Sequence, residues 1–330
     1  MMQNQRWVLA SRPTAAVSED NFRLEEAPVP AAAEGEVLVK NLWLSLDPYM
    51  RGRMSAAKSY VKGVDIGEVM VGQTAGEVLE SRHPGFRKGD TVLTQLGWQL
   101  YGTAREVTRV DAGRWPLSYY LGVLGMPGLT AYFGLKEIGQ PQAGETVVVS
   151  AASGAVGSVV GQLAHLRGCR AVGIAGGAQK CDYVARELGF DACIDYRKTD
   201  FQKHLEAACP KGIDVYFDNV GGPVLETVLR LMNLRSRVVV CGMISDYSAA
   251  EPYGVKSLRA VLVNRIRMQG MIVFDWKDRY GEGMKALGAP LAEGRIRYRE
   301  SVLEGLASAP RGLIGLLRGE NLGKQLVKLA

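Results

Sequence analysis

The feature that most constrains the fold is the stretch of residues 147–164, whose pattern indicates a buried strand, a glycine turn and the start of a helix. Residues 147–149 are a β-branched run after a polar turn, which is typical of an interior parallel strand. Gly154 and Gly157 let the backbone turn tightly and approach a ligand without an intervening Cβ atom. Apolar residues then recur at helical spacing, namely Val156, Val159, Val160 and Leu163.

This turn predicts a site for an anionic group. A helix that begins there points N–H groups and the positive end of its dipole outward, which suits a pyrophosphate. The pattern is G-x-G-x-x-G with Ala152 in place of the first glycine, so the window by itself also fits a plain strand-to-helix turn. We favour dinucleotide binding because strands and helices alternate in the residues that follow.

That alternation predicts a doubly wound parallel sheet of the Rossmann type, an α/β fold. The strands are predicted at 147–149, 171–175, 192–195, 214–218, 237–241 and 268–273. Helical patterns separate most of them, at 158–166, 179–188, 201–208 and 223–231.

The residues on either side predict a smaller, β-rich domain. Short strands are predicted at 7–10, 36–40, 42–46, 67–79, 91–94 and 104–110. The C-terminal residues resemble the first domain again, with a predicted strand at 298–301, a helix at 302–318 and a strand at 326–329. We therefore expect a first domain of residues 1–120, completed by 297–330, and a central dinucleotide-binding domain of residues 121–296.

Composition argues against several classes of partner and site. The net charge of +6 is spread along the 330 residues without a dense Lys/Arg block, so we expect no nucleic-acid surface. No signal pattern and no bilayer-length apolar run is found, so we expect a cytoplasmic protein without a membrane partner. An odd number of scattered cysteines argues against a disulfide framework and suggests reduced thiols, at Cys169, Cys181, Cys193, Cys209 and Cys241. No Cys/His cluster has zinc-ligand spacing, so no metal site is expected.

The region after the second predicted strand favours NADP(H) over NAD(H). An NAD-binding fold usually places an acidic residue there, on the ribose 2′-hydroxyl. No Asp or Glu lies between Arg170 and Lys180, and a lysine attracts a 2′-phosphate. We therefore expect Lys180 to bind that phosphate, helped by the hydroxyl of Tyr196; the alternative is a solvated lysine at a helix start.

Two more loops follow predicted parallel strands at the edge where such sheets bind ligands. Residues 218–222 follow the fourth strand and residues 241–247 follow the fifth. Taken alone, either loop could be an ordinary connection after a strand, with no role in ligand binding.

Five motifs then occur in one order along the chain: 46–54 (LDPYMRGRM), 151–157 (AASGAVG), 217–222 (FDNVGG), 241–245 (CGMIS) and 321–324 (NLGK). On these motifs the chain resembles the zinc-independent medium-chain dehydrogenase/reductases, specifically the prostaglandin reductase (leukotriene B4 12-hydroxydehydrogenase) group with its bacterial curcumin-reductase-like members. The resemblance covers nearly the whole length. It implies a GroES-like catalytic domain, a Rossmann domain and a homodimer joined through Rossmann edge strands.

The resemblance also implies NADPH-dependent reduction of the C=C bond of α,β-unsaturated ketones or aldehydes. The pyrophosphate-binding residues it implies are Gly154, Ala155, Val156 and Gly157, with Lys180 and Tyr196 on the 2′-phosphate. The remaining cofactor contacts it implies are Asn219, Cys241, Gly242, Met243, Ile244, Ser245, Tyr247, Ile272, Val273, Phe274 and Asn321. Eukaryotic members carry a tyrosine where this chain has Val263, so substrate contacts from that region do not transfer. The absence of zinc-ligand spacing agrees with the C=C reduction that the resemblance implies, because hydride addition to an enone needs no metal to polarise an alcohol.

We expect hydride to add to the β-carbon and a hydroxyl donor to stabilise the enolate that forms. Tyr49 and Tyr247 are the candidates because both lie on loops expected to face the nicotinamide, although each could only pack against cofactor or substrate. Two other functions remain open on the same sequence: a quinone or alcohol oxidoreductase, and a non-catalytic NADP(H)-binding sensor. The intact loop of residues 47–54 argues against the sensor.

Overall fold

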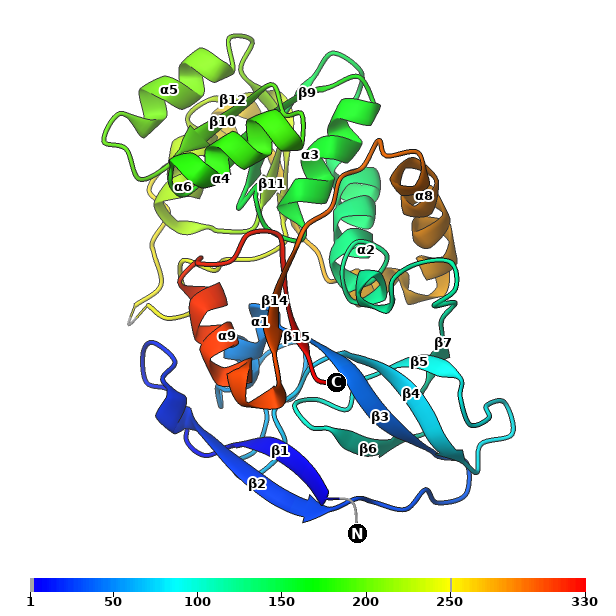
Figure 1. Ribbon diagram of the computed structural model, residues 1–330. Coiled ribbons are helices and arrows are strands. Elements are labelled where there is room, and N and C mark those ends of the chain that lie inside the picture. The colour runs from blue at the N-terminus through cyan, green and yellow to red at the C-terminus, as the bar shows by residue number, and fades with distance from the viewer. Residues whose placement is uncertain (1–2, 250) are drawn as a thin grey trace. The chain divides into compact units, whose positions relative to one another are not determined.

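The computed structural model describes residues 3–249 and 251–330, which form two compact units (Figure 1). Unit 1 extends to Gly122 and resumes over Glu300–Ala330, while unit 2 is Val123–Arg299. Unit 2 is thus inserted between the two pieces of unit 1.

Unit 2 is built around a six-stranded parallel sheet with the strand order β10-β9-β8-β11-β12-β13. Its strands are β8 (Thr146–Ser150), β9 (Arg170–Ala175), β10 (Ala192–Asp195), β11 (Ile213–Asp218), β12 (Met232–Val240) and β13 (Arg267–Gly270). This order is that of a dinucleotide-binding sheet, so the predicted Rossmann architecture is confirmed. The strand order reverses between β8 and β11, where ligands of such sheets bind.

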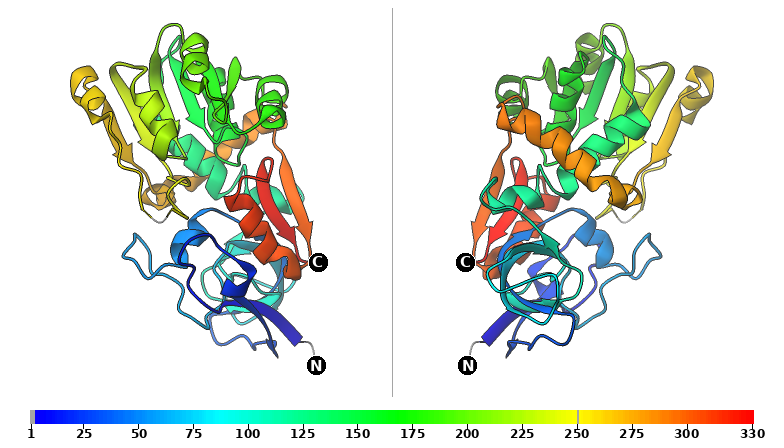
Figure 2. Two further views of the ribbon diagram at one scale, coloured as in Figure 1. Left: turned by 90° about the vertical axis from the view of Figure 1, so that its left-hand side faces the viewer. Right: turned by 90° about the vertical axis from the view of Figure 1, so that its right-hand side faces the viewer.

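Helices lie on both sides of this sheet (Figure 2). They are α2 (Met126–Phe133), α3 (Gly157–Leu166), α4 (Ala178–Asp182), α5 (Phe201–Ala208), α6 (Gly222–Leu229), α7 (Leu258–Asn264) and α8 (Tyr280–Ala292). Apolar residues of α5 and α6 share a buried cluster with Val148, Val172 and Ile174 on one face of the sheet. Because side chains alternate along a strand, residues 171 and 173 belong to the opposite face.

Unit 1 is β-rich, as predicted. Its main sheet has the order β14-β15-β3-β4-β5-β7, β6 pairs with β3, and β1 and β2 form a separate antiparallel pair. The strands are β1 (Gln3–Leu9), β2 (Phe22–Pro28), β3 (Val37–Ser45), β4 (Thr74–Ser81), β5 (Thr91–Thr94), β6 (Tyr101–Ala104), β7 (Thr108–Arg109), β14 (Glu300–Glu304) and β15 (Lys324–Lys328), and the α-helices are α1 (Tyr49–Arg53) and α9 (Ala309–Leu317).

Several predicted element bounds were wrong, mostly where pairing partners are distant in sequence. The predicted strand 67–79 begins only at Thr74, and the predicted strand 104–110 is broken into β6 and β7. The residues predicted to begin the last helix at 302 instead extend β14 to Glu304, because that strand pairs with β15. The sixth parallel strand ends at Gly270, and Val273 already begins a 3-10 helix, Val273–Arg279. The predicted helix 179–188 is α4 followed by a π-helical turn, Tyr183–Glu187.

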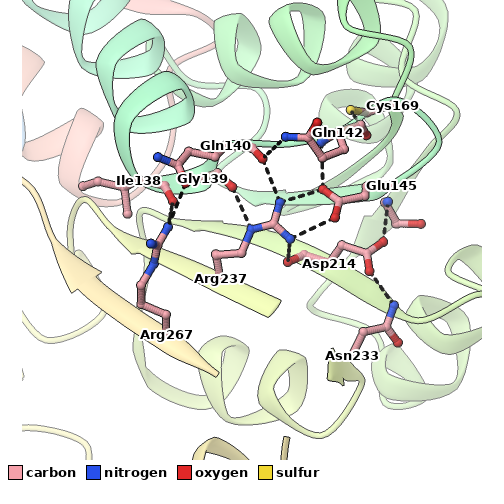
Figure 3. A network of polar contacts seen from close by, with 11 residues as sticks. Ile138, Gly139, Gln140, Gln142, Glu145, Cys169, Asp214, Asn233, Arg237 and Arg267 are labelled. Atoms are coloured by element: carbon pink, nitrogen blue, oxygen red, sulfur yellow. Dashed lines mark hydrogen bonds and ion pairs between the residues drawn. The ribbon is translucent and has the colours of Figure 1, made fainter. Parts of the chain in front are cut away.

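Arg237 holds the amino-terminal ends of the unit 2 strands together (Figure 3). It lies on β12 and contacts both carboxylate oxygens of Glu145, at 2.9 and 2.6 Å. Its guanidinium also donates to the carbonyl oxygens of Gly139 and Gln140, each at 2.9 Å. Burial would raise the pKa of Glu145, but the hydrogen bonds from Arg237 and the Gln142 N–H outweigh it, so the pKa lies below its ordinary value.

We expect Arg237→Met to lower the free energy of unfolding by about 2 kcal/mol, because the carboxylate and two carbonyls lose a partly buried cation. Arg237→Lys should be less destabilising than Arg237→Met but still less stable than the parent protein, since a lysine ammonium cannot make the bidentate contact with the Glu145 carboxylate. Urea denaturation measures both. Arg235→Met, an exposed position on the same strand, is the matched control. Equal stability of the Arg237→Met and Arg235→Met proteins would show that the cluster does not stabilise the fold.

Candidate functional site

The glycine turn after β8 takes a left-handed backbone at Ala151, whose φ is 50°. Ala152, in the position of the missing glycine, has no positive φ; it is fully buried and its N–H donates to the Ile174 carbonyl at 3.0 Å. Its methyl group packs over Gly173, where a Cβ atom would stand 2.8 Å away. Alanine therefore fits at position 152, because the conformation that favours glycine falls on its neighbour.

Gly157 is the first residue of α3 and packs closely against Ala151 of this turn. A Cβ atom there would overlap the carbonyl oxygen of Ala151, so the close approach requires glycine. N–H groups at the start of a helix have no acceptor within the helix, and among the described residues no side-chain hydrogen bond caps the start of α3. These donors, together with the helix dipole, fit a pyrophosphate.

Asp218 ends β11 at the point where the strand order reverses, and it is fully buried. Its Oδ1 accepts hydrogen bonds from Tyr216 Oη at 2.8 Å, from Ser150 Oγ at 3.2 Å, and from two N–H groups of the following loop. Burial raises the pKa of Asp218, and these hydrogen bonds oppose the rise. Asp218 thereby fixes the loop that carries Asn219.

Ser150, the last residue of β8, holds Asn219 from the neighbouring strand. The Asn219 N–H donates to Ser150 Oγ at 2.9 Å and its side-chain amide donates to the Ser150 carbonyl at 2.8 Å. Neither Ser150 nor Asp218 was predicted as a site residue. The available signal was that each ends one of two adjacent parallel strands.

The loop 241–247 lies against the same residues. The N–H groups of Cys241 and Gly242 donate to the Asp218 carbonyl at 2.8 and 3.1 Å, and Ile244 N–H donates to the Asn219 carbonyl at 3.3 Å. The Tyr247 hydroxyl lies beside Gly242, 3.4 Å from where a Cβ atom would stand. The structure thus brings Asn219 and this loop together, with Met243 and Ser245 exposed on it. Burial raises the pKa of Cys241 to about 12, so its thiol stays protonated.

Lys180 on α4 and Tyr196 beyond β10 lie near a second cation, Arg197. The Arg197 guanidinium carbon is 6.0 Å from the centre of the Tyr196 ring. Burial, and then the charge of Arg197, lower the pKa of Lys180, as expected for two neighbouring cations. A phosphate dianion would relieve this repulsion, so the donor set fits a 2′-phosphate. Arg197 was not predicted, although it directly follows Tyr196.

The acid of this region, Asp195, is already engaged by the backbone. Its Oδ1 accepts the N–H groups of Gly177 at 2.9 Å and Arg197 at 3.1 Å. Those N–H groups, Gly177 first, lower the pKa of Asp195. The carboxylate therefore ties the end of β10 to the start of α4 and orders the region around Lys180.

The remaining unit 2 residues of the predicted site follow β13. Ile272 is half-buried, Val273 is buried and Phe274 is exposed. Val263, which stands where eukaryotic members of the family carry a tyrosine, is exposed on α7.

Tyr49 and Asn321 belong to unit 1, where a buried ion pair joins the segments that carry them. Lys324 Nζ donates to Asp47 Oδ1 at 2.8 Å and to the Leu46 carbonyl at 2.7 Å, and its side chain is 1% exposed. Burial lowers the pKa of Lys324 against the opposing effect of Asp47. Asp47 also accepts a hydrogen bond from Ser45 Oγ.

Tyr49 is the first residue of α1, two positions after Asp47. Burial, followed by the charge of Asp47, raises the pKa of Tyr49 above its ordinary value. Its hydroxyl therefore keeps its proton at neutral and alkaline pH and can donate a hydrogen bond. Asn321 precedes β15 and donates its side-chain amide to the Gly323 carbonyl at 2.8 Å.

Among the described residues, no group of three or more His, Cys, Asp or Glu side chains is arranged to hold a metal ion. No helix in that part of the chain is both long and apolar enough to cross a bilayer.

Two family models match the chain. An N-terminal domain of oxidoreductases matches residues 5–110 and a zinc-binding dehydrogenase domain matches residues 155–288. The NADPH-dependent curcumin reductase of Escherichia coli strain K12 is 51% identical over 99% of this chain and 97% of its own length. The NADP(+)-dependent 2-alkenal reductase of Nicotiana tabacum is 41% identical over 100% of this chain and 98% of its own. The crystal structure of CurA from Vibrio vulnificus in complex with NADPH has a TM-score of 0.95 and 48% identity, covering 99% of each chain.

Proposed function

Because this chain belongs to the medium-chain dehydrogenase/reductase family, in the group that includes the curcumin, 2-alkenal and prostaglandin reductases, we propose that it is an NADPH-dependent reductase of the C=C bond of α,β-unsaturated ketones and aldehydes. The observation that supports NADPH as the cofactor is the presence in unit 2 of two arrangements that suit its phosphate groups. The N–H groups at the start of α3, which no side chain caps, fit the pyrophosphate, and Lys180 with Tyr196 and Arg197 fits a 2′-phosphate.

The other predicted cofactor residues are proposed for the nicotinamide half. Asn219 is held by Ser150, and the loop 241–247 is held by the Asp218 and Asn219 carbonyls, so both are ordered before a ligand binds. Ile272, Val273, Phe274 and Asn321 are proposed to complete this half. Preorganised contacts of this kind cost little entropy on binding.

When bound, NADPH supplies the hydride, which we propose is added to the β-carbon of the enone. Negative charge then develops on the carbonyl oxygen, and a protonated hydroxyl aimed at it lowers the barrier. Tyr49 is the first candidate for this donor because its raised pKa keeps the proton in place, and Tyr247 is the second. Solvent supplies the α-proton.

Relatives named for alkenal and curcumin reduction favour an enone over a quinone or a simple alcohol as substrate. A homodimer and a cytoplasmic location are also proposed from the family likeness. Light scattering of the purified protein tests the dimer, since a single monomeric mass would contradict it.

Lys180→Ala is expected to raise the Kd for NADPH about tenfold, because one charge-assisted hydrogen bond to the 2′-phosphate is lost. Arg197→Ala should act in the same direction with a smaller effect, since its side chain is more exposed. The Kd for NADH, which has no 2′-phosphate, should change little in either variant. Fluorescence titration measures each Kd, and Lys198→Ala, an exposed neighbouring lysine, is the control. A parallel loss of NADPH and NADH affinity would contradict the assignment.

A further inference from the structure

A long irregular segment, residues 241–257, connects β12 to α7 and begins with the loop proposed for the nicotinamide half of the cofactor. Its described residues form no helix or strand, and none of those from 248 to 257 is fully buried, although Val255 packs against the cluster shared with α5 and α6. A connection this long has few buried contacts to hold it in one conformation. Its course therefore depends on how its two ends are fixed.

The near end, residues 241–245, is held by the residues that follow β11. In addition to the contacts with Asp218 and Asn219, the Val220 carbonyl accepts the Ser245 N–H at 3.1 Å and the Ser245 hydroxyl at 2.6 Å. Ser245 also packs over Gly222, where a Cβ atom would stand 2.7 Å from Ser245 Oγ. The near end is thus fixed to the turn that leads into α6.

The far end, Lys256 and Ser257, is held by a buried carboxylate on the same helix, Glu226, which is 5% exposed. Its Oε2 accepts the N–H groups of Lys256 at 2.7 Å and Ser257 at 3.1 Å. Its Oε1 accepts the Ser257 hydroxyl, and also Arg230 Nη2 at 3.0 Å. Arg230 Nε donates to Ser257 Oγ at 3.1 Å, so the Ser257 hydroxyl accepts from Arg230 and donates to Glu226.

An ionised carboxylate suits this position. Ser257 directly precedes α7, but its own side chain does not cap that helix. Glu226 accepts N–H groups there instead, at the end of α7 where the helix dipole favours a negative charge. The donors, the Ser257 hydroxyl first, outweigh burial and lower the pKa of Glu226 to about 2. The carboxylate therefore keeps its charge at neutral pH, and charge-assisted hydrogen bonds hold the far end firmly.

We propose that Glu226 is a positioning residue for enone reduction, which fixes the far end of residues 241–257 to α6 and so sets how the residues after Tyr247 border the substrate site. The role in reduction rests on the proposed function. A segment held only at its near end has to be ordered when the substrate binds, and that ordering lowers the affinity. Glu226 thus acts through the segment rather than on the reacting atoms.

Glu226→Gln tests this role, because glutamine keeps the size of the side chain but places an NH2 donor where the partners also donate. The expected result is faster amide hydrogen exchange in peptides that cover residues 246–257. The KM for the enone should rise about tenfold, the effect of losing one charge-assisted hydrogen bond. Both kcat and the Kd for NADPH should change by less than about twofold, because the near end and the phosphate sites keep their contacts.

Two further variants calibrate this result. Ser257→Ala removes only the hydroxyl donor to Glu226, so it should change exchange and KM in the same direction by a smaller factor. Glu206→Gln changes an exposed glutamate on α5 and should behave like the parent protein. Thermal denaturation of all the variants shows whether the fold is retained.

Equal exchange of residues 246–257 in the parent and Glu226→Gln proteins would overturn the proposal, as would faster exchange with an unchanged KM for an enone that the parent reduces. Faster exchange throughout unit 2 would give Glu226 a purely structural role and would also contradict it. Hydrogen exchange does not depend on turnover. A local increase in a protein that reduces no enone would therefore support the anchoring by Glu226 and count against the proposed function alone.

Discussion

Replacing Tyr49 by phenylalanine is expected to lower kcat for the reduction of an enone by about two to three orders of magnitude, the usual effect of removing one donor from a developing oxyanion. The hydroxyl has a raised pKa caused by burial and by Asp47, so it stays protonated as charge develops on the substrate oxygen. Its helix α1 follows a segment held by the buried Lys324–Asp47 pair. Because the ring is retained, the KM for NADPH should change little. Stopped-flow or steady-state kinetics measure kcat, and Tyr101→Phe on β6 is the control.

The pH dependence of the parent enzyme is a second readout of the same residue. Since the pKa of Tyr49 lies above its ordinary value of 10.0, kcat should not fall as the pH approaches that value. Tyr247→Phe measures the contribution of the second candidate. Full turnover of an enone by both the Tyr49→Phe and the Tyr247→Phe enzymes would show that neither hydroxyl stabilises the enolate.

Lys324→Met is expected to lower the free energy of unfolding by about 3–5 kcal/mol, the cost of leaving one member of a buried ion pair alone. The variant leaves the Asp47 carboxylate buried without its cation; among the described residues only the Ser45 hydroxyl then remains as a side-chain hydrogen-bond partner. It also removes the donor to the Leu46 carbonyl. Thermal and chemical denaturation measure the loss. It should be accompanied by a fall in kcat, because the segment that leads into α1 loses its anchor.

Two further variants identify the cause. Lys328→Met changes an exposed lysine on the same strand and should be nearly neutral. The double variant Lys324→Met/Asp47→Leu removes both charges and should be more stable than Lys324→Met alone. If the single and double variants are equally unstable, lost packing rather than a stranded charge explains the effect.

The sequence predicted the parallel sheet because its strands are buried and carry that signal themselves. The run at residues 147–149 and its counterparts need no knowledge of partners, so their existence and order along the chain were predictable. Element bounds in unit 1 were not, because β14 and β15, or β3 and β6, define each other through pairing across distant segments. The sequence pattern within one segment does not show which distant strand it will pair with.

The same contrast holds for the site. Lys180 and Tyr196 could be proposed from an absent acid and a strand end, but the cation Arg197 beside them needed the fold. The Lys324–Asp47 pair joins residues 277 positions apart. The role of Ala152 became clear only from the positive φ of Ala151. Such contacts follow from register and burial, which a single sequence does not record.

The most direct test of the central claim is reduction of an acyclic enone with NADPH that carries deuterium at the transferable position, followed by NMR of the product. We expect the saturated ketone with one deuterium on the β-carbon, formed with NADPH at a kcat/KM well above that with NADH. Under the same conditions quinones and simple alcohols or ketones should react slowly or not at all. An allylic alcohol with deuterium on the carbonyl carbon, or rapid turnover of quinones without turnover of any enone, would contradict the account.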